Sequence, residues 1–175
     1  DPFCFDVTEY LAEENTLVIR VRDHLSRKIL PYGKQRRDRG GMWYTPVSGI
    51  WQTVWLEWVP EQYIRALRIR TGENWAEITA SGVERGTITV FAPEGTVTAE
   101  LSGGMARIQL AFPRMWSPED PYLYHFKLTA GEDEVESYFA LRTLSIETVD
   151  GKPSLCLNGK PYFFHGLLDQ GYWSD

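Results

Sequence analysis

The sequence predicts an all-β fold class for most of this 175-residue chain. From about residue 60, short runs alternate apolar and polar residues with the period of two expected of half-buried strands, and no long helical period appears. Turn residues separate these runs at regular intervals, which is typical of an immunoglobulin-like β-sandwich. The seven predicted strands cover residues 63–70, 75–80, 87–91, 96–101, 106–112, 123–130 and 134–141.

Turn-forming residues mark the connections between these strands. They occur at residues 71–74, 81–82, 93–95, 102–104, 117–118 and 131–133. No pair of cysteines brackets the predicted sandwich, so its stability must come from burial of apolar side chains. The predicted core residues are Ile64, Leu67, Ile69, Ile78, Ile88, Val90, Leu110, Leu128 and Phe139.

The segment before the sandwich also has strand-like patterns. Residues 5–11 and 15–21 predict a pair of half-buried strands joined by a turn at 13–15. Residues 40–49 are rich in glycine, proline and serine and predict a loop. Residues 50–58 predict a strand with large apolar groups on both faces, which belongs in the middle of a sandwich or between two domains.

Residues 24–39 form a polar, basic stretch without an apolar period. An anion-binding site and a long solvated loop both fit this composition. A loop of this length is unusual in a compact domain unless it covers something. We therefore expect a solvated loop with a possible covering role.

The last segment predicts two hairpin turns and one buried strand. The dipeptides Asp150-Gly151 and Asn158-Gly159 are strong signals of two-residue hairpin turns. The apolar run at residues 162–168 fits a strand buried on both faces, as in a parallel barrel.

Composition narrows the classes of function. The formal net charge of −6 argues against binding of nucleic acid, and no apolar run approaches the roughly 20 residues that a membrane helix needs. We expect Cys4 and Cys156 to be buried thiols rather than a disulfide. His24, His125 and His165 are too scattered to predict a metal site, and no phosphate-binding loop or other cofactor motif occurs.

Four stretches resemble one known family in the order in which that family has them. The run W-Y-T-P-V-S-G-I-W-Q-T-V-W-L-E at 43–57 resembles the closing hairpin of the sugar-binding domain of glycoside hydrolase family 2, the group of β-galactosidases, β-glucuronidases and β-mannosidases. Residues 5–21 resemble the strand pair that precedes this hairpin. Residues 116–124 resemble a late loop of the family's immunoglobulin-like domain, and residues 155–166 resemble its entry into the catalytic barrel.

This resemblance implies three regions. Residues 1–59 would be the C-terminal part of a jelly-roll, galactose-binding-like domain. Residues 60–142 would be the immunoglobulin-like sandwich, and residues 143–175 a hairpin and first strand leading into a TIM barrel. One strand cannot close a barrel that takes about 250 residues. We therefore expect the catalytic barrel of the same polypeptide to be missing from this chain.

The resemblance also implies where the catalytic groups lie. Retaining glycosidases use two carboxyl groups, which in this family would be glutamates on later barrel strands, the acid/base following an asparagine. No Asn-Glu dipeptide occurs in the sequence. We therefore expect no catalytic residue in this chain. It would act as a non-catalytic accessory region of an enzyme that hydrolyses terminal β-glycosidic bonds, with carbohydrate as the substrate of the parent enzyme.

Four residues are candidates for the edge of the substrate pocket in the intact enzyme. In β-galactosidases an aspartate at the end of the strand matching 18–22 reaches that pocket, and Asp23 stands at this position. Capping of the strand end explains Asp23 equally well. Asp169, Gln170 and Tyr172 would follow the first barrel strand, on the side where barrel active sites form, or they are turn and packing groups.

Trp43 and Trp116 are candidate platforms for sugar stacking, although Trp116 also fits a loop anchor beside Pro118 and Pro121. Two other functions stay open. In a carbohydrate-binding module, several tryptophans would be exposed on one face and a sugar would quench their fluorescence. In a structural interaction domain, sugars would have no effect and the exposed aromatic surface would drive self-association.

Overall fold

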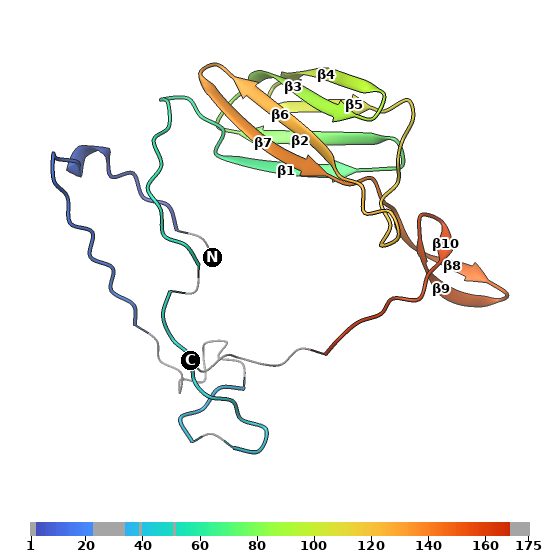
Figure 1. Cartoon of the computed structure of the whole chain (residues 1–175), viewed down its shortest axis with the longest axis horizontal. Coiled ribbons are helices and arrows are strands. Elements are labelled where there is room, and N and C mark those ends of the chain that lie inside the picture. Colours follow the sequence, from blue (N-terminus) through green and yellow to red (C-terminus); the bar gives the residue numbers. More distant parts are fainter. Residues whose placement is uncertain (1–2, 23–33, 39, 51, 169–175) are drawn as a thin grey trace. The chain divides into compact units, whose positions relative to one another are not determined.

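The computed structural model describes residues 3–22, 34–38, 40–50 and 52–168. Residues Leu56–Gly166 form one compact unit, and the other described residues belong to a second unit. The first unit contains all the strands found in the described residues, whereas the described part of the second contains one turn of 3-10 helix, η1 (Thr8–Tyr10), and isolated bridges (Figure 1). Within the described ranges, no helix is long and apolar enough to cross a membrane.

Seven strands form one antiparallel sheet with the order β1-β2-β5-β4-β3-β6-β7. Each of them coincides with one of the seven predicted strands, so the predicted all-β sandwich is confirmed. The strands are β1 (Ala66–Thr71), β2 (Trp75–Ser81), β3 (Arg85–Ala92), β4 (Gly95–Ser102), β5 (Met105–Gln109), β6 (Tyr124–Ala130) and β7 (Asp133–Phe139).

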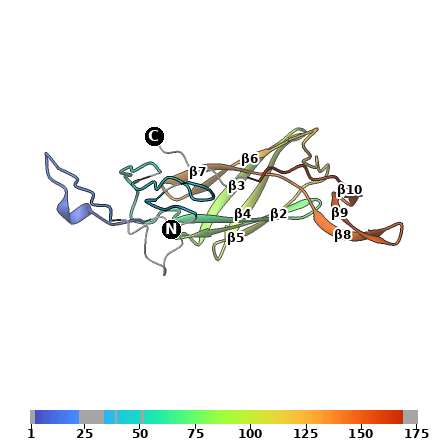
Figure 2. The ribbon, with the colours of Figure 1, turned by 90° about the horizontal axis from the view of Figure 1, so that it is seen from below.

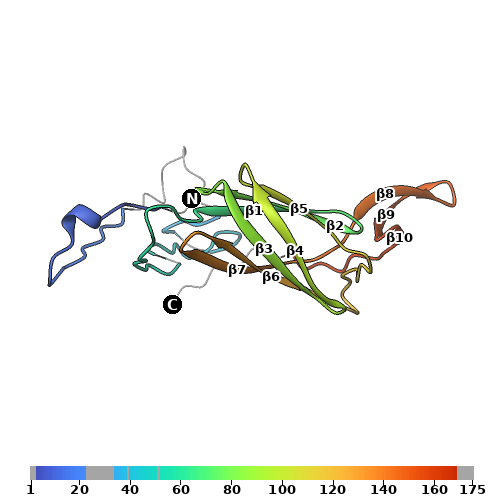
Figure 3. The same ribbon diagram turned by 90° about the horizontal axis from the view of Figure 1, so that it is seen from above.

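The sheet folds over on itself into two layers. β4 and β5 pair only at Ser102 and Met105, next to the turn that joins them, while β3 and β4 pair along their whole length. Figure 3 shows that β3 and β4 run obliquely to β1, β2 and β5. Buried and exposed residues alternate along β2 and β6, and their buried side chains belong to one cluster. A single core on one face of this sheet requires that its two halves pack against each other.

The predicted core is largely correct. Seven of the nine predicted residues are buried, and Leu67 and Ile69 are half-buried against the same cluster. A close backbone approach fixes one turn at the end of β2. Gly82 has φ +91°, and a Cβ there would lie 2.2 Å from the carbonyl oxygen of Tyr63, so only glycine fits.

A second, three-stranded sheet has the order β10-β9-β8 (Figure 2). Its strands are β8 (Leu144–Val149), β9 (Lys152–Leu157) and β10 (Lys160–Pro161). Both of its two-residue turns have positive φ at each central position, with values of 51° and 73° at Asp150-Gly151 and 53° and 72° at Asn158-Gly159. Such backbone geometry favours aspartate, asparagine and glycine, which confirms both predicted hairpin turns.

The strands predicted for residues 5–21 and 50–58 are absent from the described parts of those segments. Their apolar side chains are exposed, with 75% of Leu17, 83% of Val18 and 77% of Trp58 accessible. A strand needs backbone partners on a neighbouring strand, and a lone hairpin is only marginally stable. None of the described residues pairs with these segments as a strand. The predicted loop at 40–49 is confirmed, since Gly40, Gly41 and Gly49 have positive φ.

Two predictions for buried groups are wrong. Residues 162–168 form no strand, and Leu167 and Leu168 are 98% and 86% exposed, because no described strand pairs with this segment. Both cysteines are free, as expected, but only Cys156 is buried, whereas Cys4 is exposed in a segment without a core.

Candidate functional site

The connection between β5 and β6, residues 110–123, is an irregular segment of the sandwich and is here named the Arg114 loop. Three prolines, Pro113, Pro118 and Pro121, restrict its backbone. Between them, Ser117 and Asp120 exchange backbone hydrogen bonds of 3.0 and 3.1 Å, and the Ser117 hydroxyl accepts another from the Asp120 N–H. The sequence therefore builds a rigid turn at one end of the sandwich.

An ion pair closes this loop. The Arg114 guanidinium donates from Nε and Nη2 to the two carboxylate oxygens of Asp120 at 2.8 and 2.6 Å. The same guanidinium lies 4.4 Å from the ring centre of Tyr122. The hydrogen bond from Arg114 holds the pKa of Asp120 below its usual value, and the bond to Asp120 raises the pKa of Arg114. Because the pair has two hydrogen bonds, it fixes the relative orientation of Arg114 and Asp120 as well as the distance between them.

Tyr124 anchors the loop to the core. Its side chain is fully buried at the start of β6, and its hydroxyl accepts a 2.7 Å hydrogen bond from the backbone N–H of Arg114. Its ring stacks on Phe139 at 5.3 Å and meets Tyr122 edge-on at 4.8 Å. Burial raises the pKa of the Tyr124 phenol. The buried hydroxyl is therefore a structural acceptor that stays protonated in neutral solution.

Asn158 connects the β8–β10 sheet to the Arg114 loop. Its side-chain amide donates a 3.0 Å hydrogen bond to the carbonyl oxygen of Trp116. Its side-chain oxygen accepts from the N–H of Thr143 at 3.0 Å, and its own N–H donates to the Thr143 carbonyl at 2.9 Å. The N–H of Trp116 in turn donates to the carbonyl of Leu141 at 2.8 Å. One side chain thus ties together the turn after β9, the segment before β8 and the loop.

A second contact lies beside the first. The hydroxyl of Tyr162, just after β10, donates a 3.0 Å hydrogen bond to the carboxylate of Glu119. Hydrogen bonds from its own backbone N–H, from Ser117 and from Tyr162 lower the pKa of Glu119, and the bond to Glu119 raises the pKa of Tyr162. The Asn158–Trp116 and Tyr162–Glu119 contacts are here together named the clamp.

The clamp suits a mechanical role better than a chemical one. A glycosidase acid needs a raised pKa, whereas Asp6, Glu119 and Asp120, the carboxyl groups with displaced pKa values in the described chain, are all shifted downward. Among the described residues, no group of three histidine, cysteine, aspartate or glutamate side chains is arranged to hold a metal ion. What the clamp can do is fix the direction in which the chain leaves the sandwich.

The predicted substrate-edge residues Asp23, Asp169, Gln170 and Tyr172 lie outside the described residues, so their role stays a prediction. Of the two candidate sugar platforms, Trp43 is half-buried in the loop of the second unit. The guanidinium of Arg36 lies 3.5 Å from the centre of its ring. A sugar that stacks on that face would have to replace Arg36, so a cation–π contact holds the position that a sugar would need.

Trp116 is half-buried, and Arg142 lies 5.3 Å from its ring centre. Its backbone N–H and carbonyl are both bonded to residues outside the loop, namely Leu141 and Asn158. These contacts fit the alternative in which Trp116 anchors the loop. They leave its stacking role as a prediction.

Apart from Trp116, a candidate loop anchor, sequence reasoning missed the residues that make the clamp and the buried Tyr124 that anchors the loop. Asn158 was identified only as a turn residue, and Glu119, Tyr124 and Tyr162 only as parts of motifs or runs. A partial signal exists for the loop, because three prolines around an Arg–Asp pair indicate a rigid turn that needs an anchor. No local pattern indicates that Asn158 reaches a residue 42 positions earlier.

The sequence and the fold of this chain are similar to those of known proteins. Residues 64–142, which include β1–β7 and the Arg114 loop, match the family model described as glycosyl hydrolases family 2. A putative β-glucuronidase of Formosa agariphila is 26% identical over 188 residues, covering 94% of this chain and 22% of the relative. A β-galactosidase of Lactococcus lactis is 25% identical over 181 residues, covering 95% of this chain and 17% of the relative.

The solved structure of a Faecalibacterium prausnitzii β-glucuronidase is also similar. It superposes with a TM-score of 0.51 at 25% identity, over 61% of this chain and 18% of that protein. The chain therefore spans about a fifth of the length of the relatives that it matches.

Proposed function

Because this chain belongs to glycoside hydrolase family 2, we propose that it is a non-catalytic accessory region of a retaining enzyme that hydrolyses terminal β-glycosidic bonds. In this proposal residues 1–59 complete a jelly-roll sugar-binding domain, residues 60–142 are the immunoglobulin-like sandwich, and residues 143–175 lead into a catalytic TIM barrel. The accessory region orients the barrel and helps to close its pocket. The catalytic glutamates belong to the barrel.

The clamp is the observation that supports this role most strongly. Asn158 and Tyr162 bond to the Arg114 loop from either side of β10. The chain that would enter the barrel follows directly after them. A misplacement of about 1 Å in a catalytic arrangement can lower the rate about a hundredfold. A sandwich that holds the barrel entry in one direction would therefore act on catalysis without contacting the substrate.

The exposed face of the β8–β9 hairpin supports the existence of a partner. Ile146 and Leu155 are directly paired across the hairpin and are 72% and 55% exposed, and Leu144 on the same face is 63% exposed. A monomeric domain rarely leaves such large apolar groups together in water. Since the relatives are about five times as long as this chain, we assign the covering partner to the remainder of the same polypeptide.

The names of the relatives support two substrates. The similar proteins of Formosa agariphila and Faecalibacterium prausnitzii are described as β-glucuronidases, and the one of Lactococcus lactis as a β-galactosidase. The parent enzyme would thus release a terminal β-linked glucuronic acid or galactose. The two substrates differ in the carboxylate at C6 and in the configuration at C4, so a pair of chromogenic glycosides distinguishes them.

The test begins with the reading frame that encodes these residues, sequenced on both sides. The proposal predicts about 250 further residues of alternating strand and helix, with an Asn-Glu dipeptide and a second glutamate later in the sequence. The full polypeptide should hydrolyse p-nitrophenyl β-glucuronide or the corresponding galactoside, and the 175-residue chain alone should hydrolyse neither. A reading frame without such a region, or hydrolysis by the 175-residue chain, would overturn the proposal.

A further inference from the structure

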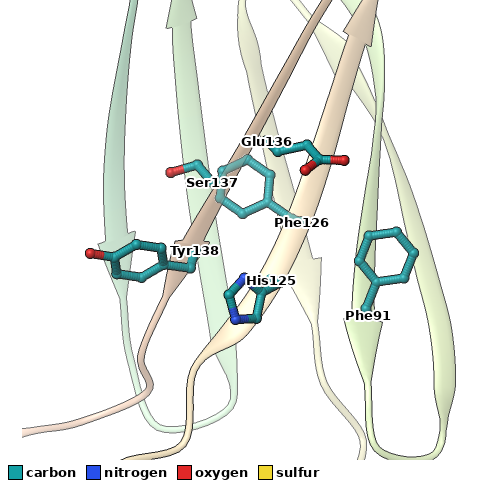
Figure 4. Close-up of a pocket in the computed structure, with 6 residues that line it drawn as sticks. All are labelled: Phe91, His125, Phe126, Glu136, Ser137 and Tyr138. Atoms are coloured by element: carbon teal, nitrogen blue, oxygen red, sulfur yellow. The ribbon is translucent and has the colours of Figure 1, made fainter.

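Three aromatic rings lie in a row on the outer face of the sandwich, one each from β3, β6 and β7 (Figure 4). Phe91 pairs directly with His125, and His125 pairs directly with Tyr138, so the three residues occupy neighbouring positions on one face. The rings of His125 and Tyr138 have centroids 6.0 Å apart. Phe91 and Tyr138 are 47% and 57% exposed. These residues are here named the aromatic row.

The aromatic row is not part of the core. On β6 the neighbours of His125, Tyr124 and Phe126, are buried under the sheet, and the alternation of the strand places His125 on the opposite side. Nor do the three residues contribute any of the contacts described for the clamp. Neither packing within the sandwich nor attachment of the β8–β10 sheet explains why three aromatic residues share this surface.

The row lies in a shallow hollow of about 350 Å³, which Glu136 on the same face also lines. Phe126 and Ser137 contribute to its floor from positions whose side chains face the core. This volume is at the small end of the range for pockets that bind small molecules, about 300–1,000 Å³. The hollow is therefore large enough for a small ligand.

The polar groups at the hollow define the chemistry of that ligand. The Glu136 carboxylate is held 3.8 Å from the Lys127 ammonium, which also pairs with Glu134 at 2.7 Å. A carboxylate accepts hydrogen bonds from hydroxyl groups, and imidazole and phenol groups both donate and accept them. The ligand should thus carry an apolar face for the rings and hydroxyl groups at its edge.

Charge distinguishes neutral ligands from acidic ones. Two carboxylates, on Glu134 and Glu136, flank a single cation, Lys127, on this face of β6 and β7. The local charge is therefore negative and disfavours an anionic ligand. A pyranose without a carboxyl group meets both requirements, because its C–H face is apolar and its rim carries hydroxyl groups.

We propose that the aromatic row is a binding site for a neutral pyranoside. The sugar stacks its C–H face on Phe91 and Tyr138 and donates a hydroxyl hydrogen bond to Glu136. This proposal does not rest on the proposed function, because the binding requires neither a barrel nor hydrolysis. A chain that binds the sugar and has no hydrolase attached would support this site and overturn the other proposal.

The test is an NMR titration of the full 175-residue chain, following the aromatic and imidazole resonances. The probes are methyl β-D-glucopyranoside and methyl β-D-galactopyranoside, with methyl β-D-glucuronide as the anionic comparison. We expect saturable shifts of Phe91, His125 and Tyr138 with a Kd of about 1 to 10 mM for at least one neutral probe. The glucuronide should bind at least about fivefold more weakly because of Glu134 and Glu136.

Variants separate this site from a general surface effect. Phe91→Ala and Tyr138→Ala should each weaken binding about fivefold or more, the loss expected for one ring contact. Phe112→Ala removes a 74% exposed aromatic ring outside the hollow and should leave binding unchanged. Either of two results would overturn the proposal: no saturation by about 50 mM of either neutral probe, or shifts that follow protein concentration rather than sugar, which would mean that a second copy covers the row.

Discussion

The side-chain amide of Asn158 donates a 3.0 Å hydrogen bond to the carbonyl oxygen of Trp116, 42 residues earlier in the chain. Asn158 also occupies a turn position with φ 53°, a conformation that asparagine tolerates better than most residues. The same residue therefore shapes the turn after β9 and attaches that turn to the sandwich.

Replacing Asn158 by glycine separates these two roles. Glycine keeps the positive φ but removes the side-chain bonds to Trp116 and Thr143. We expect Asn158→Gly to lower the free energy of unfolding by about 1–3 kcal/mol, since a half-buried carbonyl loses its donor. Asp150→Gly, in the matching turn between β8 and β9, should change it by less than about 0.5 kcal/mol. Urea unfolding followed by tryptophan fluorescence measures both, and equal effects of the two variants would contradict the clamp.

The hydroxyl of the buried Tyr124 should matter more for stability than the hydroxyl of a tyrosine on the surface. Tyr124→Phe keeps the ring stacked on Phe139 but leaves the N–H of Arg114 without its 2.7 Å acceptor. The expected loss is about 1–2 kcal/mol in the free energy of unfolding. Tyr138→Phe, at a 57% exposed position, should change stability by less than about 0.5 kcal/mol. If Tyr124→Phe left the free energy of unfolding unchanged, water would have replaced the phenol as acceptor for the N–H of Arg114.

The Arg114 loop should lose stability in acid. The pKa values of Asp120 and Glu119 lie below their ordinary values of 3.8 and 4.5, so the folded chain favours their charged forms. Their contribution is fully present above those ordinary values and is lost as the pH falls through the lowered folded-state values. Thermal melts between about pH 6 and pH 3 should show the decline. Asp120→Asn should show a smaller decline, and an identical slope in both proteins would rule out this pair as its source.

The bond made by Tyr162 should make stability fall at alkaline pH. Its bond to Glu119 raises its pKa above the ordinary value of 10.0. The contribution of this bond is present below that value and is lost as the pH rises through the raised one. Tyr162→Phe should therefore remove part of the alkaline loss of stability, measured by melts above about pH 9. If Tyr162→Phe lost as much thermal stability at alkaline pH as the unsubstituted chain, the bond would contribute nothing measurable.

Residues with local signals were predictable from the sequence. The strands β1–β7 follow from the period of two and from turn residues such as Gly82, and the turns of the β8–β10 sheet follow from Asp150-Gly151 and Asn158-Gly159. Residues whose state depends on a distant partner were not predictable. Leu17 and Leu167 have strand-like neighbours but lack a paired strand among the described residues, and Asn158 gave no sign of its bond to Trp116.

A glycine pair tests the packing of the sandwich. A Cβ at residue 82 would meet the Tyr63 carbonyl at 2.2 Å, whereas one at residue 103 would meet nothing within 4 Å, although both glycines have positive φ. Gly103→Ala should cost about 1–2 kcal/mol in the free energy of unfolding from the backbone alone. Gly82→Ala adds the clash and should cost clearly more, as measured by urea unfolding. Equal costs would mean that the turn after β2 shifts freely.

The most direct test of the accessory role is the kcat/KM of the full polypeptide that contains this chain, measured with Asn158→Gly and with Asp150→Gly. If the clamp orients a catalytic barrel, Asn158→Gly should lower kcat/KM for the cleaved β-glycoside by about tenfold or more, and Asp150→Gly should leave it unchanged. Equal activity of the two variants, at a temperature where both are folded, would contradict the account.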